Sequence, residues 1–159
     1  MFLIRIQIFF LIALSFLFAQ DETRPEDTTP PELLNFTIST QSVDVTESSQ
    51  TVTLTVEASD DISGLQAIWG GFNSPSGQYL SFYFSPDGDG GLVQTITADI
   101  TFNEYIESGT WSISTLLMQD LVGNMEQFSA QELVDMGFET DIEVLYGVVS
   151  GCMDPYAEN

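Results

Sequence analysis

The sequence predicts an all-β fold, an antiparallel β-sandwich of about seven strands with one short helical turn before the last strand. From Leu33 onwards, apolar and polar residues alternate in short runs rich in Val, Ile, Thr and aromatic residues, as is typical of strands with one buried face. Gly, Pro, Asp and Ser separate these runs and favour turns. Because so many short strands follow one another, we expect two layered antiparallel sheets.

Each strand is predicted from its own alternation, since successive side chains of a strand point to opposite faces. In the first run Leu34, Phe36 and Ile38 share one face. The clearest case is QTVTLTVEAS, residues 50–59, where apolar side chains occupy one face and threonines the other. The remaining strands are expected, in chain order, over residues 42–46, 66–72, 79–84, 92–102, 110–118 and 140–146.

The helical turn is predicted over residues 129–138, SAQELVDMGF. Ser129 and Glu132 have the spacing of a capping box, in which each side chain bonds the other residue's backbone amide. Apolar residues follow, and Gly137 is placed to end the helix.

The chain is expected to begin with a secretory signal peptide over residues 1–19. A single arginine precedes a short apolar run, and the run ends at the small residue Ala19 before a polar segment. A membrane anchor is the alternative, but a spanning helix needs about 20 apolar residues, and Gln7 and Ser15 interrupt this run. We therefore expect a secreted or cell-surface protein with no membrane insertion after signal removal. Residues 20–31 read as a polar, Pro-rich linker, and the sandwich is expected over residues 32–146.

The charge of the chain excludes several classes of function. It has 24 Asp and Glu, 2 Lys and Arg, and no His, for a formal net charge of −22. Both cations are arginines, Arg5 in the leader and Arg24 in the linker. Without Lys or His there is no Ser-His-Asp triad, Schiff base or His-ligated zinc. Nucleic acid is repelled, because binding its phosphates requires cations. Such a surface attracts cations instead.

The predicted strand order gathers acidic residues at one end of the sandwich. Antiparallel strands reverse direction in turn, so the loops 60–64, 85–91 and 119–124 are expected at the same end. The candidate metal ligands collected there are Asp60, Asp61, Asp87, Asp89, Asp120 and Asn124. The loops at the other end carry only Glu104 and Glu107. Because Ca²⁺ takes about 6–8 oxygen ligands from carboxylates, amides and carbonyls, a calcium site is predicted at the acidic end.

The same residues also fit a purely structural role. Asp in loops commonly accepts hydrogen bonds from nearby backbone amides, which would account for Asp60, Asp61 and Asp120. The segment Asp87-Gly88-Asp89-Gly90 is a favourable hairpin sequence on its own, and no Glu completes an EF-hand loop after it. Both interpretations stay open at the level of sequence.

A second kind of binding surface is suggested by aromatic residues, because flat rings stack on sugar faces. The candidates are Trp69, Phe72, Tyr79, Phe82, Tyr83 and Phe84. Alternation places half of them in the core, and Trp69 and Trp111 are most simply core residues. The partner is thus an unknown protein or a polysaccharide. An enzyme would require a catalytic domain beyond residue 159.

Several short motifs occur in a particular order along the chain. They are Thr29-Pro30-Pro31, Asp60-Asp61 followed by Ser63-Gly64-Leu65, Gly109-Thr110-Trp111, Asp120 with Gly123-Asn124, and Glu132-Leu133 to Gly137-Phe138. This order resembles bacterial immunoglobulin-like modules of secreted and cell-surface multidomain proteins, over roughly residues 29–146. The resemblance implies an immunoglobulin-like sandwich with a non-catalytic role in adhesion or spacing. The alternative is a carbohydrate-binding accessory domain of a larger secreted enzyme.

The tail GCMDPYAEN holds Cys152, the single cysteine of the chain. It resembles the first residues of a short repeat that begins Gly-Cys-Thr-Asp-Pro and closes with a second cysteine, although Met153 replaces the threonine here. We therefore expect residues 147–159 to be the start of a second, truncated module, with the disulfide partner of Cys152 missing. A free or dimer-forming thiol is the alternative. A catalytic role is not expected, since no His or Lys is present to activate the thiol.

Overall fold

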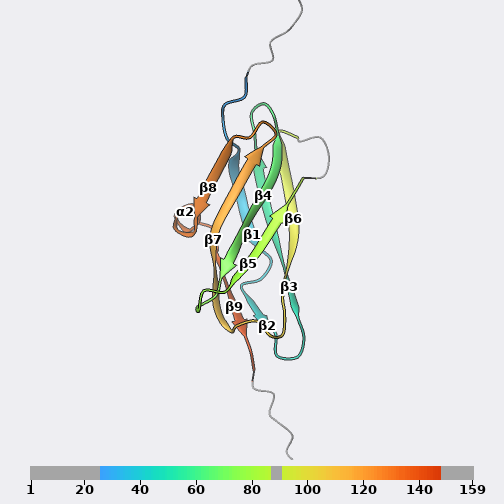
Figure 1. Ribbon diagram of the computed structural model, residues 1–159, viewed down its shortest axis with the longest axis vertical. Helices are drawn as coiled ribbons and strands as arrows, with labels where there is room; N and C mark the ends of the chain where they lie inside the picture. Colours follow the sequence, from blue (N-terminus) through green and yellow to red (C-terminus); the bar gives the residue numbers. More distant parts are fainter. Residues whose placement is uncertain (1–25, 87–90, 148–159) are drawn as a thin grey trace, which may run out of the picture.

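The computed structural model describes residues 26–86 and 91–147. Within them the chain forms nine strands and one short helix, arranged as an all-β sandwich of two sheets, which confirms the predicted fold class (Figure 1). The predictions for the leader, for Asp87 and Asp89, and for Cys152 lie outside the described residues. In the described ranges no helix is both long enough and apolar enough to cross a membrane.

The first sheet has three antiparallel strands, with β3 (Gln50–Ser59) between β1 (Glu32–Ile38) and β6 (Val93–Phe102). Strand β3 pairs along its whole length with β6, from Gln50 opposite Phe102 to Ser59 opposite Val93. The alternation in β3 decides which face meets the core, since its apolar face is fully buried and its other face carries threonines.

The second sheet has the strand order β2–β9–β7–β4–β5. These strands are β2 (Ser42–Asp44), β9 (Asp141–Leu145), β7 (Gly109–Asp120), β4 (Leu65–Asn73) and β5 (Tyr79–Phe84). Neighbours are antiparallel except β2 and β9, which are parallel.

One strand was not predicted. Strand β8 (Met125–Ser129) pairs with residues 115–119 of β7, while β9 pairs with residues 109–112 of the same strand. Between them lies helix α2 (Ala130–Asp135), shorter than predicted but with the expected capping box between Ser129 and Glu132. Strand β8 has no fully buried residue, so the sequence carries no alternation strong enough to reveal it.

The first strand also differs from its prediction. A register shift between Leu33 and Asn35 leaves Leu33 buried and Leu34 43 % exposed, whereas alternation had placed Leu34 on the inner face with Phe36. A β-bulge adds one residue to one strand of a pair and so changes which residues face the core before and after it.

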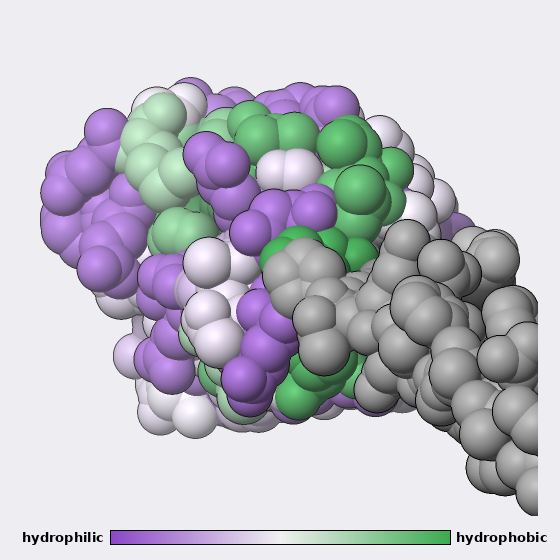
Figure 2. All heavy atoms as spheres, turned by 90° about the horizontal axis from the view of Figure 1, so that it is seen from above, coloured by the Kyte–Doolittle hydropathy of each residue, from purple (hydrophilic) through white to green (hydrophobic). Residues whose placement is uncertain are grey.

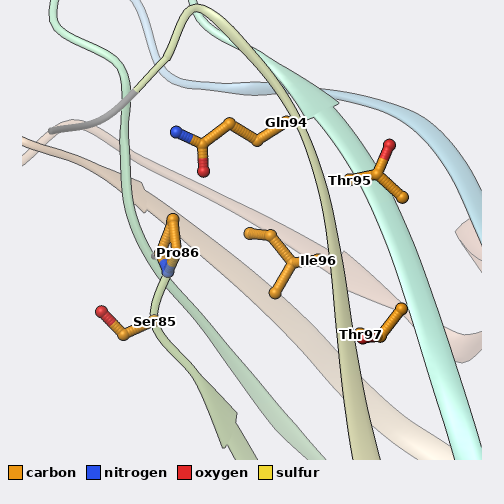
Figure 3. Close-up of a pocket in the computed structure, with 6 residues that line it drawn as sticks. All are labelled: Ser85, Pro86, Gln94, Thr95, Ile96 and Thr97. Carbon is orange, nitrogen blue, oxygen red and sulfur yellow. The ribbon is translucent and has the colours of Figure 1, made fainter. Parts of the chain in front are cut away.

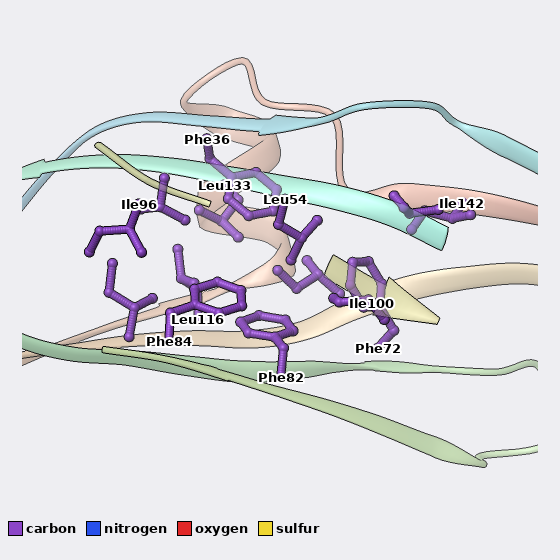
Figure 4. Packing of buried hydrophobic residues seen from close by; sticks show 14 of the residues in the cluster. Phe36, Leu54, Phe72, Phe82, Phe84, Ile96, Ile100, Leu116, Leu133 and Ile142 are labelled. Carbon is purple, nitrogen blue, oxygen red and sulfur yellow. The ribbon is translucent and has the colours of Figure 1, made fainter. Parts of the chain in front are cut away.

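Side chains from both sheets meet in a single core (Figure 4). Phe102 of the first sheet packs edge-on against Trp111 of the second, with ring centroids 5.8 Å apart and ring planes at 88°. Phe72 joins this group, 6.4 Å from Phe102. Each large apolar side chain that is fully buried contributes about 1.5–3 kcal/mol of transfer free energy, so these aromatic contacts hold the two layers together.

The sandwich is elongated, and the described chain enters at one end and leaves at the other (Figure 1). We call the first the linker end; it contains residues 26–31 and the loops 60–64 and 120–124. We call the second the hairpin end; it contains the loops 74–78 and 103–108 and the chain after β9. The loops therefore alternate between the two ends, as predicted.

Candidate functional site

The two acidic loops of the linker end lie side by side. The Leu121 amide donates to the Gly64 carbonyl at 2.9 Å, and Leu65 pairs with Asp120 where strands β4 and β7 meet. Asp60, Asp61, Asp120 and Asn124 are thereby brought to one end of the molecule. Figure 2 looks onto this end and shows hydrophilic residues interspersed with apolar ones.

Asp120 is completely buried and caps its own loop. Its Oδ1 accepts hydrogen bonds from the backbone amides of Val122, Gly123 and Asn124 at 2.9, 2.6 and 2.8 Å. Its Oδ2 accepts from the Asn124 side-chain amide at 2.7 Å. Because both oxygens have partners, hydrogen bonding accounts for this carboxylate, as the structural interpretation of the sequence expected.

Asp60 also accepts hydrogen bonds from the amides of its own loop, but only through one of its two carboxylate oxygens. Its Oδ1 accepts from the amides of Ile62 and Gly64 at 3.1 and 2.6 Å, and Gly64 has the positive φ of 89° that such a turn requires. Its Oδ2 is buried and has no hydrogen-bond partner, and the residue as a whole is 7 % exposed. The hydrogen bonds of the turn therefore account for the burial of Oδ1 but not for the burial of Oδ2.

The sequence did not point to Asp27, which belongs to the linker and joins the site. Its Oδ2 accepts from the Ser63 amide at 2.9 Å, and its backbone carbonyl accepts from the Asn124 side chain at 3.2 Å. Two residues later the Thr29 hydroxyl donates to Asp61 Oδ1 at 2.5 Å. The linker is thus attached to the sandwich from residue 27. The sequence does contain one indication of this turn, the spacing Asp27-x-Thr29. In such turns the Asp side chain accepts a hydrogen bond from the amide two residues later, as the Thr29 amide donates to Asp27 here.

Hydrogen bonds favour the charged form of Asp27. The Ser63 hydroxyl, followed by the backbone amides of Thr29 and Ser63, holds the pKa of the Asp27 carboxyl below its usual range.

One carboxylate oxygen from each of Asp27, Asp60 and Asp61 lies within 4.8 Å of the other two. These are the residues that the fold groups as potential metal ligands. Asp120 is held apart by its own loop, and the positions of Asp87 and Asp89 fall outside the described residues.

Two hollows open beside this cluster. One of about 240 Å³ is lined by Asp60, Asp61, Glu32 and the Thr29–Pro30 step. The other, of about 580 Å³, is lined by residues 26–28 of the linker and by both acidic loops. The cluster thus borders open space on the side of the linker.

The predicted aromatic candidates divide between the two faces of the second sheet. Phe72, Phe82 and Phe84 are buried in the core, whereas Tyr79 and Tyr83 are 57 % and 67 % exposed and Trp69 is half-buried. The prediction that Trp69 is a core residue is therefore wrong, while Trp111 is buried as expected. Strand alternation is the cause, since Trp69 follows the inward-facing Ile68.

The three outer aromatic residues lie on adjacent strands. Trp69 stands directly opposite Tyr83 in the pairing of β4 with β5. The Tyr79 ring covers Gly71, where an added Cβ would lie 2.4 Å from a ring atom. A hollow of about 490 Å³ beside Trp69 and Tyr83 is also lined by Gln66, Ser85 and Gln119, whose side chains offer hydrogen bonds.

A further hollow, of about 390 Å³, lies between the end of β5 and the start of β6 (Figure 3). Its lining, Ser85, Pro86 and residues 94–97, is neutral. It therefore offers hydrogen-bonding groups but no charge to a ligand.

At the hairpin end, Glu107 joins two loops. Its carboxylate accepts from the Ser74 hydroxyl and from the amide and hydroxyl of Ser76, the latter two at 3.1 and 2.6 Å. Its backbone carbonyl accepts from the Trp111 indole nitrogen at 2.8 Å. The Ser74 hydroxyl, followed by the Ser76 hydroxyl, holds the pKa of Glu107 below its usual range. Both carboxylate oxygens of Glu107 therefore have hydrogen-bond partners, whereas Oδ2 of Asp60 at the linker end has none.

Comparison of the chain with known protein families and with curated proteins finds no match in either set.

Proposed function

We propose that this chain is a non-catalytic extracellular or cell-surface module of the immunoglobulin-like type, which acts in spacing or adhesion. The observation that carries the proposal is the position of the chain ends, since residues 26 and 147 leave an elongated sandwich at opposite ends (Figure 1). A module with this geometry adds its full length to whatever it connects. The apolar leader and the acidic, Lys-free composition are in keeping with an exported protein.

The strand order supports the immunoglobulin-like assignment. In such domains the strands named A, B, E and D form one sheet, and the strands C, F and G form the other. Here β1, β3 and β6 correspond to A, B and E, and β4, β7 and β9 correspond to C, F and G. One difference from antibody domains is that the buried tryptophan, Trp111, belongs to β7 rather than to β4.

A spacer must resist force along its length, and the pairing of β9, the last described strand, with β2 suits that task. Strands β2 and β9 are parallel, with the Val45 amide donating to the Leu145 carbonyl at 3.0 Å and the Glu143 amide donating to the Gln41 carbonyl at 2.8 Å. Hydrogen bonds between strands lie across the strand direction. A pull along the long axis therefore loads the hydrogen bonds between β2 and β9 together rather than opening them one at a time.

Force spectroscopy tests the spacer role. The chain held at its two ends is expected to unfold in one cooperative rupture. A Gln78→Cys variant held at position 78 and at the C-terminal end provides the control, because both points lie at the hairpin end and the strands are then peeled apart. We expect a clearly lower rupture force in the control. Equal forces in the two geometries would contradict the spacer role.

The outer aromatic face supports carbohydrate binding as a second candidate. Half-buried Trp69 and exposed Tyr83 lie beside the amides of Gln66 and Gln119, and Tyr79 is exposed on the same strand as Tyr83. Ring stacking combined with amide hydrogen bonds is how flat sugars are held. Trp69→Ala and Tyr83→Ala are each expected to weaken binding to a polysaccharide roughly tenfold.

The control for this test is Tyr105→Ala, because Tyr105 is 88 % exposed but lies in the loop 103–108 at the hairpin end. Phe84 is not a useful target, since it is 4 % exposed and its loss would disturb the core. Polysaccharide binding that survives both substitutions on the aromatic face would exclude this candidate.

A further inference from the structure

We propose that Asp27, Asp60 and Asp61 form a binding site for one divalent cation of the calcium type, which fastens the linker segment 26–31 to the loop 60–64. The site differs from the one that the sequence suggested, because its ligands include a linker residue and exclude Asp120. Its consequence for spacing, a stiff junction between linker and sandwich, rests on the proposed function.

The spacing of the three carboxylates fits a single ion. Calcium binds oxygen at about 2.3–2.6 Å, so two ligand oxygens of one ion lie up to about 5 Å apart. One oxygen from each of Asp27, Asp60 and Asp61 meets this condition, with all separations within 4.8 Å. The three side chains therefore reach one coordination sphere without a change of fold.

The free oxygen of Asp60 is an independent indication of a ligand. Asp60 is 7 % exposed, and the amides of Ile62 and Gly64 bind its Oδ1. Its Oδ2 is buried without a partner. A buried, unpartnered carboxylate oxygen costs free energy, because it has lost the hydrogen bonds of water and gained nothing in exchange. A cation beside the carboxylate supplies the missing interaction.

The part of the chain that the structure describes provides no neutralising charge at this place. Residues 26–86 and 91–147 contain no Lys, Arg or His, and Glu32 adds a further acidic residue to the neighbouring hollow. The metal ligands available here are oxygen atoms, including the Thr29 hydroxyl next to Asp61. The residue ranges 26–86 and 91–147 contain no His or Cys, and their only sulfur atoms are Met thioethers. Oxygen donors of this kind select calcium or magnesium rather than zinc or copper. The three carboxylates differ in burial, and Asp61 is exposed. Such an irregular arrangement favours calcium over magnesium, because calcium accepts irregular coordination geometry.

Asn124 has a positioning role in this arrangement. Its side-chain amide reaches Asp120 Oδ2 at 2.7 Å and the carbonyls of Asp27 and Thr29, both at 3.2 Å. It therefore connects the capped loop 120–124 with the linker and holds Asp27 over the loop 60–64.

The test is calorimetric titration of the folded chain with Ca²⁺. One ion per chain is expected, with weaker binding of Mg²⁺. Asp27→Asn and Asp61→Asn are each expected to raise Kd at least tenfold while the fold is kept, since Asn retains an oxygen acceptor. Asp44→Asn is the matched control, because it removes the same charge from an exposed residue of β2 near the hairpin end (Figure 1) and is expected to leave Kd unchanged. Asp60 is left intact because its Oδ1 also shapes the loop.

Two results would overturn the site. One is a heat signal that NaCl reproduces at equal ionic strength, which would show general screening of the negative surface. The other is an equal rise in Kd for Asp44→Asn and Asp27→Asn. The force measurement separates this proposal from the spacer role. A chain that resists axial force but binds no Ca²⁺ would refute the cation site alone, and one that binds Ca²⁺ but unfolds equally in both pulling geometries would refute the spacer alone.

Discussion

Glu107 is a single carboxylate whose bonds join the hairpin loop 74–78 to the loop 103–108. It accepts hydrogen bonds from Ser74 and Ser76, while its backbone carbonyl accepts from the Trp111 indole. Since Trp111 is a central core residue, the surface loops and the core are connected through this one position. The charged form of Glu107 is the form that makes these bonds, so its protonation weakens the hairpin end.

This role predicts a defined pH dependence. The pKa of Glu107 in the folded chain lies below its ordinary value of 4.5, so the ionised group stabilises the fold above that value. The stabilisation is lost as the pH falls through the lower folded pKa. Thermal melts between pH 7 and pH 2, compared for the natural chain and Glu107→Gln, are expected to show a gap in Tm that is constant above about pH 4.5 and closes below it.

Glu104→Gln is the control for this measurement. It removes a carboxylate from the same loop but leaves the hydrogen bonds of Glu107 in place. A gap between the natural chain and Glu107→Gln that persists unchanged at the lowest pH would contradict the account. The bonds to Ser74 and Ser76 would then owe nothing to the carboxylate charge.

Helix α2 is stabilised by the packing of its one buried side chain against the core. It has six residues, too few for an isolated helix to persist in water. Its capping box bonds the exposed Ser129 and Glu132, and a single side chain, Leu133, is buried beneath it. The helix is thus a short cover over the core between β8 and β9.

Substitutions on the two faces of α2 are expected to differ sharply. Leu133 is 0 % exposed and Val134 is 49 % exposed. Leu133→Ala is expected to lower the free energy of unfolding by about 2–5 kcal/mol, because it leaves a cavity. Val134→Ala is expected to change it by no more than about 0.5 kcal/mol. Denaturant titration measures both, and similar losses for the two variants would show that α2 is held by something other than Leu133.

Alternation of apolar residues predicted the strands whose inner face is fully buried, of which β3 is the clearest example. It missed β8, which has no such face, and it placed Leu34 inside because a bulge cannot be read from periodicity. The meeting of loops 60–64 and 120–124 followed from the reversal of antiparallel strands. Asp27 was beyond this reasoning, since its position depends on Ser63 and Asn124, residues 36 and 97 positions away.

The whole molecule is elongated and negatively charged, and the carboxylates at its two ends differ in how far hydrogen bonds satisfy them. Its formal net charge is −22 at pH 7, and the described residues carry no cationic side chain. At the hairpin end, hydroxyl and amide donors satisfy the carboxylate of Glu107. At the linker end, three carboxylates converge and one buried oxygen lacks a donor. The cation site proposed above would satisfy this oxygen in the way that hydrogen bonds satisfy the carboxylate of Glu107.

The most direct measurement is a Ca²⁺ titration of the isotopically labelled chain followed through its backbone amide resonances. If one ion binds between Asp27, Asp60 and Asp61, the shifts saturate at one ion per chain and are confined to residues 26–31, the loop 60–64 and their immediate neighbours. Shifts that grow without saturation, spread over distant exposed acids such as Glu47, Asp99 and Asp135, would contradict it. The cations would then form a diffuse cloud around the molecule, with no site between linker and sandwich.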